Sequence, residues 1–247
     1  MQGLTAIIIT LNEAAHIEAC LDAVAFADER IVVDSGSTDG TPELARAKGA
    51  RVEMREWPGY AAQKNAATEL ASHDWILSVD ADERVTPALA AEIRDTLQSP
   101  THAGYRVPRV TFHLGRWIRT TDWYPDYQLR LYDRRRGRWT PRRVHESVTV
   151  DGAPGRLGGE LQHYAYRDIA HHVDTINKYT TLAAEQMHAD GRRAGVGDLL
   201  LHPPAAFARN YLLRRGIADG VPGFIISAMN THYVFLKFAK LWALGRE

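Results

Sequence analysis

The sequence has almost no cysteine, no net charge of either sign and no long apolar run, and each absence excludes a class of protein. Cys20 is the only cysteine among 247 residues, so the chain has neither a disulfide framework nor a thiolate metal site. A single thiol fits a reducing cytoplasm. Lysine plus arginine and aspartate plus glutamate number 30 each, so the global charge favours neither nucleic acid nor a membrane surface as a partner.

No uninterrupted apolar segment is long enough to span a bilayer. The amino terminus, MQGLTAIIITLNE, lacks a basic first region and a small-residue cleavage site, so no signal peptide is predicted. We therefore expect a cytoplasmic protein. With 45% hydrophobic residues, the chain can form one sizeable core or a core with an appendage.

Charge is nevertheless uneven along the chain. Between Arg106 and Arg143, arginines far outnumber the aspartates, which are Asp122, Asp126 and Asp133. This basic zone favours a partner that carries phosphate or other acidic groups. The alternative is an ordinary solvated face, since the sequence RRRG at residues 134–137 is typical of a hairpin tip.

Apolar runs alternate with helical patterns through about the first hundred residues. Strands are predicted at residues 4–10, 30–34, 51–55 and 75–79, and helices at 14–24 and 60–71 and after the Thr-Pro pairs at 41–42 and 86–87. This alternation predicts an α/β fold with a parallel sheet. Shorter, more antiparallel strands follow at 105–114, 127–133, 147–150 and 160–166. From Asp168 the pattern is helical, with further helices around a turn at 216–223. The first of these helices is expected to place His171 and His172 on its surface and to bury a stripe of Ile169, Val173, Ile176, Tyr179, Leu182 and Met187.

Three predicted strands end in polar clusters, at residues 12–13, 34–39 and 80–83. In parallel sheets, ligands bind beyond the carboxyl ends of the strands, so all three clusters are expected at one edge. The last cluster ends the run DWILSVDADERV with Asp80, Asp82 and Glu83. Such close carboxylates repel one another unless a cation lies between them, so they form either a solvated turn or a metal site.

Five segments, TAIIITLNE, IVVDSGSTDGT, GYAAQKNAA, WILSVDADE and RRVHE, occur in this order. In this combination the sequence resembles family 2 of the glycosyltransferases, nucleotide-sugar-dependent enzymes of the GT-A fold. Within that family, WYPDYQLRLYDRR, RRVHESV and NKYTTLAAEQM resemble the lipopolysaccharide core glucosyltransferases that act on inner-core heptose. The resemblance is strong over the first hundred residues and continues through His163.

The resemblance implies a GT-A catalytic domain at residues 1–167, a Rossmann-like mixed sheet flanked by helices. Its nucleotide-sugar-binding half is expected at 1–100 and its acceptor-side half at 101–167, followed by a helical C-terminal region at 168–247. No QxxRW motif is present, which argues against polysaccharide synthesis and for transfer of a single sugar.

By resemblance, Asp80 and Asp82 are the DxD motif, with Asp82 on the metal and Asp80 towards the ribose and the metal. A divalent cation would neutralise the charge that develops on the nucleoside diphosphate, and hard carboxylate oxygens suit Mg²⁺ or Mn²⁺. His163 is a candidate third ligand, and a satisfied core or helix-capping histidine is its alternative.

The nucleoside site implied by the resemblance comes from the three strand ends. Asp34 would hydrogen-bond the uracil, although an Asx-turn that caps the next helix is a compatible role. Lys64 would meet the base or the diphosphate, unless it lies on a helix surface. The remaining predicted contacts are Ser37 and Asp39 around Asp34, and Asn12 and Glu13 beside the nucleoside.

Direct displacement at the anomeric carbon requires a base that removes a proton from the acceptor hydroxyl. Glu146, in VHE, is the leading candidate and Asp126, in YPDYQ, is the alternative; either could instead hold the acceptor through its hydroxyls. The implied partners are a UDP-sugar donor, with glucose first, and a lipopolysaccharide core or other lipid-linked saccharide acceptor.

Two other functions compete with this interpretation: a haloacid dehalogenase-like phosphohydrolase that uses the DxD, and a non-catalytic sugar-binding scaffold. In the former the DxD follows the first strand, whereas here it ends the fourth. The C-terminal helices are expected either to pack on the catalytic domain or a second subunit, or to rest on the cytoplasmic face of the inner membrane as a peripheral contact.

Overall fold

The computed structural model describes residues 2–140 and 147–246. The chain divides into two compact units, each made of two stretches of sequence. The first unit comprises Met1–Arg109 and Asp126–His163, and the second comprises Val110–Pro125 and Tyr164–Glu247. The chain enters the second unit for the last time at Tyr164, close to the domain boundary predicted at residue 167. Residues 110–125, predicted within the acceptor-side half at 101–167, belong to the second unit together with the C-terminal helices.

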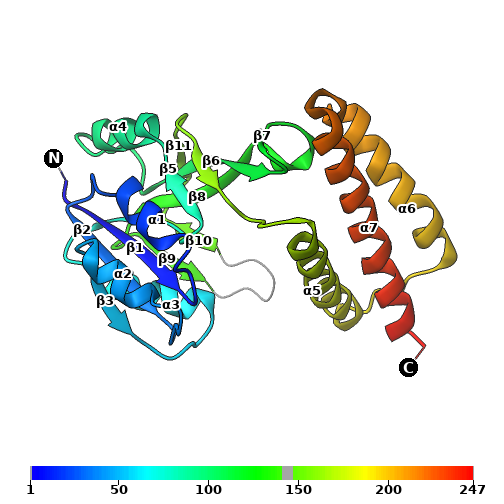
Figure 1. Ribbon diagram of the computed structural model, residues 1–247, viewed down its shortest axis with the longest axis horizontal. Coiled ribbons are helices and arrows are strands. Elements are labelled where there is room, and N and C mark those ends of the chain that lie inside the picture. The colour runs from blue at the N-terminus through cyan, green and yellow to red at the C-terminus, as the bar shows by residue number, and fades with distance from the viewer. Residues whose placement is uncertain (1, 141–146, 247) are drawn as a thin grey trace. The chain divides into compact units, whose positions relative to one another are not determined.

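The parallel part of the first unit follows the predicted alternation of strands and helices (Figure 1). Its strands lie in the order β3 (Arg51–Met54), β2 (Glu29–Asp34), β1 (Leu4–Thr10) and β4 (Trp75–Ser78), and neighbouring strands run parallel. The helices between them are α1 (Ile17–Ala23), α2 (Thr41–Ala47) and α3 (Tyr60–Glu69). Pro42 follows Thr41 as predicted, but Thr41 is the first residue of α2 and Gly40 is its N-cap.

Antiparallel strands extend this sheet beyond β4. The order continues through β8 (Asp126–Asp133), β6 (Gly104–His113), β12 (Leu161–His163) and β5 (Glu83–Val85). The short β11 (Gly155–Arg156) pairs with β6 in parallel. Helix α4 (Pro87–Thr96) begins at the N-cap Thr86, as predicted, and β9 (Gly137–Thr140) pairs with β10 (Ser147–Val150) as a separate hairpin. The predicted fold class, a Rossmann-like mixed sheet flanked by helices and followed by a helical C-terminal region, is confirmed.

Alternate residues of β1 enter two different cores, because successive side chains of a strand point to opposite faces. Ala6 and Ile8 pack in one cluster with Leu21 of α1. Ile7 packs in the other with Ala67 of α3. A strand that is apolar on both faces is therefore covered by helices on both sides, and its polar carboxyl end is what remains for a ligand.

The second unit contains a short antiparallel segment and three long helices. Strand β7 (Arg116–Ile118) pairs with the end of β6 and leads to the 3₁₀ turn η1 (Thr121–Trp123). Helix α7 (Gly220–Leu244) packs against α5 (Ile169–Ala189) and α6 (Val196–Ala208), with the π-helical turn η2 (Arg209–Leu213) and the 3₁₀ turn η3 (Gly216–Asp219) between α6 and α7. None of the helices in the described ranges is long and apolar enough to cross a membrane.

Helix α5 was predicted to bury a stripe that includes Val173, Ile176, Tyr179 and Leu182. Only Ile176 of these is buried, together with residues of an adjacent stripe, His172, Thr180 and Ala184. The apolar spacing thus predicted the helix, but the rotation of its core face was wrong. A surface position for His172 was wrong for the same reason.

Candidate functional site

The three polar clusters meet at the carboxyl ends of β1, β2 and β4, as the parallel order predicts. Thr10, the last residue of β1, is the register partner of Asp34, the last residue of β2, and its hydroxyl donates to the Asp34 carboxylate at 2.7 Å. On the other side, β1 pairs with β4, which leads directly into residues 80–83. The order of the strands therefore brings all three polar clusters to one edge of the sheet.

Asp34 is fully buried and organises the loop that follows β2. One carboxylate oxygen accepts from the backbone N–H groups of Gly36 and Ser37, at 2.9 and 2.7 Å, and the other accepts from the hydroxyls of Thr10 and Ser37. This is the predicted Asx-turn. The role of Asp34 towards uracil stays a prediction.

The loop after β1 is hydrogen-bonded to the loop after β2. Asn12 has a left-handed backbone, with φ of 57°, and its side-chain carbonyl accepts from the Thr38 N–H at 2.9 Å. The Ser37 hydroxyl accepts from the Asn12 N–H at 2.7 Å, and the Asp39 carboxylate accepts from the Ala14 N–H at 2.9 Å. Asn12, Ser37 and Asp39 are thus brought together as expected, and their hydrogen bonds to backbone groups join the two loops.

Asp80 lies between two cations. Lys64 Nζ is 2.7 Å from one carboxylate oxygen and an Arg130 guanidinium nitrogen is 2.6 Å from the other. Burial opposes ionisation of Asp80, but Arg130 and Lys64 outweigh it and hold its pKa far below the usual range. Lys64 is itself buried, with its ammonium 4.4 Å above the Trp139 ring, so the helix-surface alternative for this residue is wrong.

Glu83, the third carboxylate of the acidic run, is an internal ion-pair partner. It is fully buried, and its carboxylate oxygen lies 2.6 Å from Arg130 and 3.1 Å from Arg109. Burial opposes the charge on Arg130, yet Asp80 and Glu83 raise its pKa above the ordinary value. Two arginines of the basic zone therefore hold the acidic run in place rather than presenting charge to a partner.

Asp82, which directly precedes β5, and His163, the last residue of β12, face each other. Their carboxylate oxygen and Nε2 are 3.3 Å apart. Burial opposes ionisation of Asp82, but the hydrogen bond and charge of His163 outweigh it and lower the pKa of this carboxyl. Two of the predicted metal ligands, from positions far apart in sequence, thus come together.

Glu13 adds a further carboxyl group to the same edge. Burial, and after it the negative charges of Asp82, Asp39 and Asp80, raise its pKa to about 7. Asp82, Asp39 and Asp80 thus act on the Glu13 carboxyl at this edge.

The side chains present fit a divalent cation that is shared with a ligand. Asp82 and His163 supply one oxygen and one nitrogen donor, and the nearby carboxylates of Asp82, Asp39 and Asp80 oppose ionisation of Glu13, after the larger effect of burial. No three His, Cys, Asp or Glu side chains are grouped as metal ligands within residues 2–140 and 147–246. Mg²⁺ at phosphate sites takes one or two carboxylates and completes its shell with substrate oxygens and water, so a sparse set of protein donors is sufficient.

Of the two candidate bases, Asp126 lies within the described residues. Asp126 lies at the start of β8, where Arg109 donates two hydrogen bonds to one carboxylate oxygen, at 2.6 and 3.0 Å, and Gln128 donates to the other at 2.7 Å. Glu146 lies outside the described residues.

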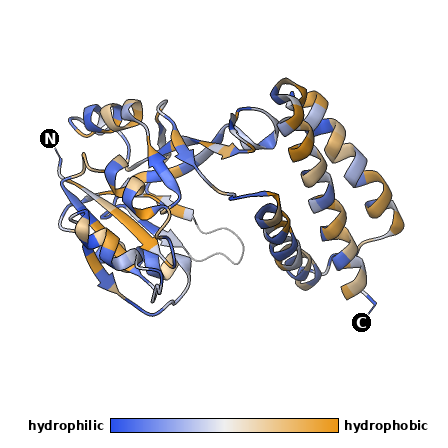
Figure 2. Cartoon of the chain, in the orientation of Figure 1, coloured by the Kyte–Doolittle hydropathy of each residue, from blue (hydrophilic) through white to orange (hydrophobic). Residues whose placement is uncertain are grey.

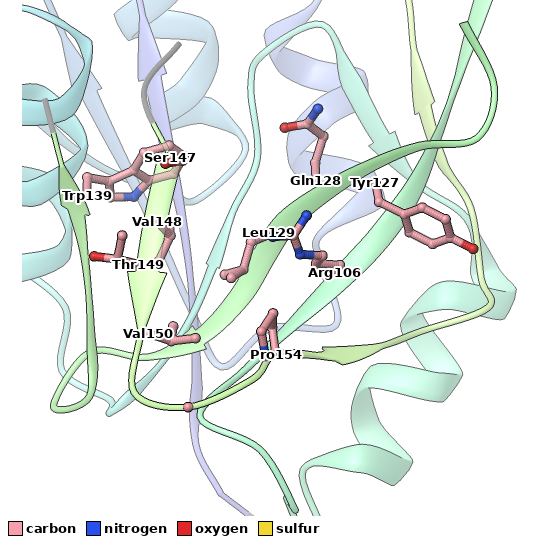
Figure 3. A pocket seen from close by; sticks show the side chains of 11 residues that line it. Arg106, Tyr127, Gln128, Leu129, Trp139, Ser147, Val148, Thr149, Val150 and Pro154 are labelled. Atoms are coloured by element: carbon pink, nitrogen blue, oxygen red, sulfur yellow. The ribbon is translucent and has the colours of Figure 1, made fainter. Parts of the chain in front are cut away.

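A cavity of about 360 Å³ lies between β8 and the β9–β10 hairpin. Figure 3 shows Trp139 and Ser147 on the hairpin side, with Leu129 and Arg106 across from them. Trp139 also contacts Lys64, the partner of Asp80, so the cavity adjoins the ion-paired end of the site.

Comparison with known proteins gives one family and several curated relatives. Residues 5–150 match the family described as "Glycosyl transferase family 2". A relative described as "Lipopolysaccharide core biosynthesis glycosyltransferase LpsC", from Rhizobium meliloti, is 34% identical over 97% of this chain and 92% of its own length. An uncharacterized glycosyltransferase of Rickettsia felis is 30% identical over 98% of this chain and 90% of its own length.

Among solved structures, a similar chain is glucosyl-3-phosphoglycerate synthase from Mycobacterium tuberculosis, in complex with Mn²⁺, UDP and glucosyl-3-phosphoglycerate. It is 28% identical, and the match covers 45% of this chain and 44% of the synthase, with a TM-score of 0.39. A likeness of this size is too weak to transfer a ligand or a geometry.

Proposed function

The chain belongs to glycosyl transferase family 2, and from that premise we propose that it transfers one hexose, glucose in our inference, from a UDP-sugar to a lipopolysaccharide core or another phosphorylated, lipid-linked saccharide. The observation that carries the proposal is the meeting of Asp82 with His163 beside the Asp80 ion pairs, at the ligand-binding edge of the sheet.

In this proposal Asp82 and His163, with Asp80 beside them, hold Mg²⁺ or Mn²⁺. The ion would neutralise charge on the diphosphate leaving group. Lys64 and Arg130 hold Asp80 in its ionised form, and the buried network through Glu83 fixes its position. Loops 12–14 and 34–41, hydrogen-bonded to each other, would hold the nucleoside.

The proposed reaction is a single displacement with inversion. The acceptor hydroxyl oxygen forms a bond to the anomeric carbon while the bond from that carbon to the diphosphate oxygen breaks. The hydroxyl proton passes to a carboxylate, and we assign this role to Glu146. Asp126 is the alternative, but both of its oxygens already accept hydrogen bonds from Arg109 and Gln128, which suits it to a positioning role.

The acceptor is inferred from the relative's name and from charge. The Rhizobium meliloti relative is described as a glycosyltransferase of lipopolysaccharide core biosynthesis. Arg106 lines the cavity beside β8 and is exposed, so unlike Arg109 and Arg130 it can meet an acidic group of an acceptor. Neither the phosphohydrolase nor the non-catalytic scaffold finds support in a match to a transferase family.

The test is a turnover assay with UDP-glucose, UDP-galactose and UDP-N-acetylglucosamine, each with Mn²⁺ and with purified core lipopolysaccharide truncated after heptose. We expect UDP release to depend on both the acceptor and one preferred donor. Glu146→Gln should lower turnover at least about a hundredfold with little change in UDP binding, because it keeps the shape but removes the proton acceptor.

Asp126→Asn is the matched variant. If it abolishes turnover and Glu146→Gln does not, the roles of the two residues are exchanged. Absence of acceptor-dependent UDP release with every donor would refute the proposed reaction.

A further inference from the structure

The outer side of helix α6 is mostly apolar, whereas a surface helix normally has a polar one. Its inward stripe consists of Pro203, Ala206 and, one turn later in η2, Asn210, which are buried. His202 is an exposed polar side chain of the helix. Most other outward positions are apolar: Leu201 is 70% exposed, and the others are Leu200, Pro204, Ala205, Ala208 and, in η2, Leu212.

The exposed apolar surface continues from α6 through the turns into α7. Leu213 of η2 is 79% exposed and Val221 of α7 is 70% exposed. The Phe224 ring on α7 lies 5.8 Å from both the Phe207 and the Tyr211 rings, so the beginning of α7 is in direct contact with the end of α6. Figure 2 shows the hydrophobic colouring along α6 and at the start of α7. We call this surface the α6–α7 face; its large exposed residues are Val196, Leu200, Leu201, Leu212, Leu213, Ile217, Val221 and Phe224.

Arginines accompany the α6–α7 face, and the acids near it are engaged. Arg209, Arg214 and Arg215 are exposed and lie in or next to η2. Arg209 and Arg214 share one acid, Asp122, so this group keeps a net positive charge. The acids within the segment itself are also occupied, since Asp198 pairs with His202 and the buried Asp219 pairs with Arg116.

From this geometry we propose that the α6–α7 face is a docking surface for an anionic lipid bilayer. The leucines and valines would enter the boundary between headgroups and acyl chains, while the arginines meet lipid phosphates. The face lies entirely in the second unit and does not depend on the proposed reaction.

A second copy of the chain is a poorer occupant. A two-fold symmetric dimer brings the same patch of both subunits together, so the net positive groups around Arg209, Arg214 and Arg215 of the two copies would repel each other. A bilayer that contains phosphatidylglycerol offers apolar chains and negative charge at once. Charge complementarity therefore selects the membrane.

The experiment is co-sedimentation of the full chain with vesicles of phosphatidylcholine alone and with 30% phosphatidylglycerol added. We expect binding to the anionic vesicles only, falling as salt rises. Leu212→Ser/Leu213→Ser should weaken binding at least about tenfold, since two exposed apolar side chains no longer enter the bilayer. Arg214→Gln/Arg215→Gln should weaken it about thirtyfold and flatten the salt dependence.

Matched controls come from the first unit. Met54→Ser removes an apolar side chain that is 53% exposed on β3, and Arg46→Gln/Arg51→Gln removes two arginines that are about half exposed. Neither should change vesicle binding. Light scattering and thermal unfolding of all variants accompany the binding measurements.

Three results would overturn the proposal. The intact chain could fail to bind anionic vesicles at low salt. It could form a dimer that Leu212→Ser/Leu213→Ser dissociates, without vesicle binding, in which case the face is a subunit interface. Or the same substitutions could lower the unfolding temperature without vesicle binding, in which case the face packs within the folded chain.

Discussion

Asp80 and Asp82 are two residues apart, yet their side chains have different kinds of partner. Asp80 is held by the fixed cations Lys64 and Arg130, whereas Asp82 faces the imidazole of His163, a side chain that can itself ligate a metal ion. A fixed cation competes with a metal ion for a carboxylate, and a neutral imidazole can share one. Of the two carboxylates, Asp82 is therefore the one better placed as a direct ligand.

Asp82→Asn tests this assignment. We expect the fold to be retained and sugar transfer to fall at least about a hundredfold at saturating Mn²⁺, because a direct ligand of the ion that stabilises the leaving group is lost. Rates of UDP release and circular dichroism measure the two effects, and Asp95→Asn on the exposed side of α4 is the control. A rate above about a tenth of wild type would refute a direct metal contact.

Arg130→Met tests the buried ion pairs. The substitution leaves Glu83 buried with Arg109 as its remaining cation, so we expect the free energy of unfolding to fall by about 3–5 kcal/mol. Urea unfolding measures the loss, and the exposed Arg138→Met is the control. The double variant Glu83→Gln/Arg130→Met should recover part of the stability; an equal or larger loss would show that Glu83 is not the group left unpaired.

At the scale of elements, helix α5 meets a cluster of rings. His172 stacks on Tyr166 with ring centroids 4.2 Å apart and lies 5.0 Å from His113 of β6. Burial, together with the smaller effects of the neighbouring His113 and His171, lowers the pKa of His172 to about 4, and burial also lowers the pKa of His113. The folded cluster therefore favours the neutral forms of His172 and His113.

The stability of the protein should therefore fall in mild acid. The unfolded chain takes up a proton on His172 near the ordinary pKa of 6.5, whereas the folded chain does so only near 4, so stability is lost as the pH falls between these values. His172→Phe keeps a ring in place and should flatten this dependence, with His113 leaving a residual slope. Urea unfolding at pH 7 and pH 5 measures it, with the exposed His232→Phe as the control; an unchanged slope in His172→Phe would contradict the assignment.

The junction of η3 with α7 requires a glycine. A Cβ at Gly223 would lie 1.9 Å from the Gly216 carbonyl oxygen, whereas a Cβ at Gly197 in α6 would meet nothing within 4 Å. We expect Gly223→Ala to destabilise the protein by about 1–3 kcal/mol through overpacking, and Gly197→Ala to stabilise it by up to about 1 kcal/mol through helix propensity. Thermal unfolding compares the pair, and equal effects of both substitutions would exclude a steric cause.

For the whole molecule, local sequence patterns predicted the helices and strands. The buried ion pairs and the core side of α5 depend on tertiary contacts, which the sequence alone does not show. The continuous apolar run at 75–79 predicted a buried strand that ends at Asp80 and Asp82, because such a strand must emerge at a polar edge. The pairing of Arg130 with Glu83 was not predictable, since it depends on β8 lying beside β4. The core side of α5 was mispredicted because its inward stripe contains His172 and Thr180, which apolar spacing does not select.

The donor site in the first unit should respond to nucleotide and metal together. If Asp82 and His163 share an ion with the diphosphate, UDP and Mn²⁺ bind cooperatively to the folded chain and stabilise it by mass action, by about 2.7 kcal/mol at a hundred times the dissociation constant. For a chain of this size we expect a rise of about 5–10 °C in the unfolding temperature, measured by calorimetry. UDP in EDTA, and UMP with Mn²⁺, should each give much smaller rises, since the first lacks the ion and the second lacks the diphosphate. An equal rise with UDP in EDTA would show that nucleotide binding needs no metal, and an unchanged response of Asp82→Asn would place the ion elsewhere.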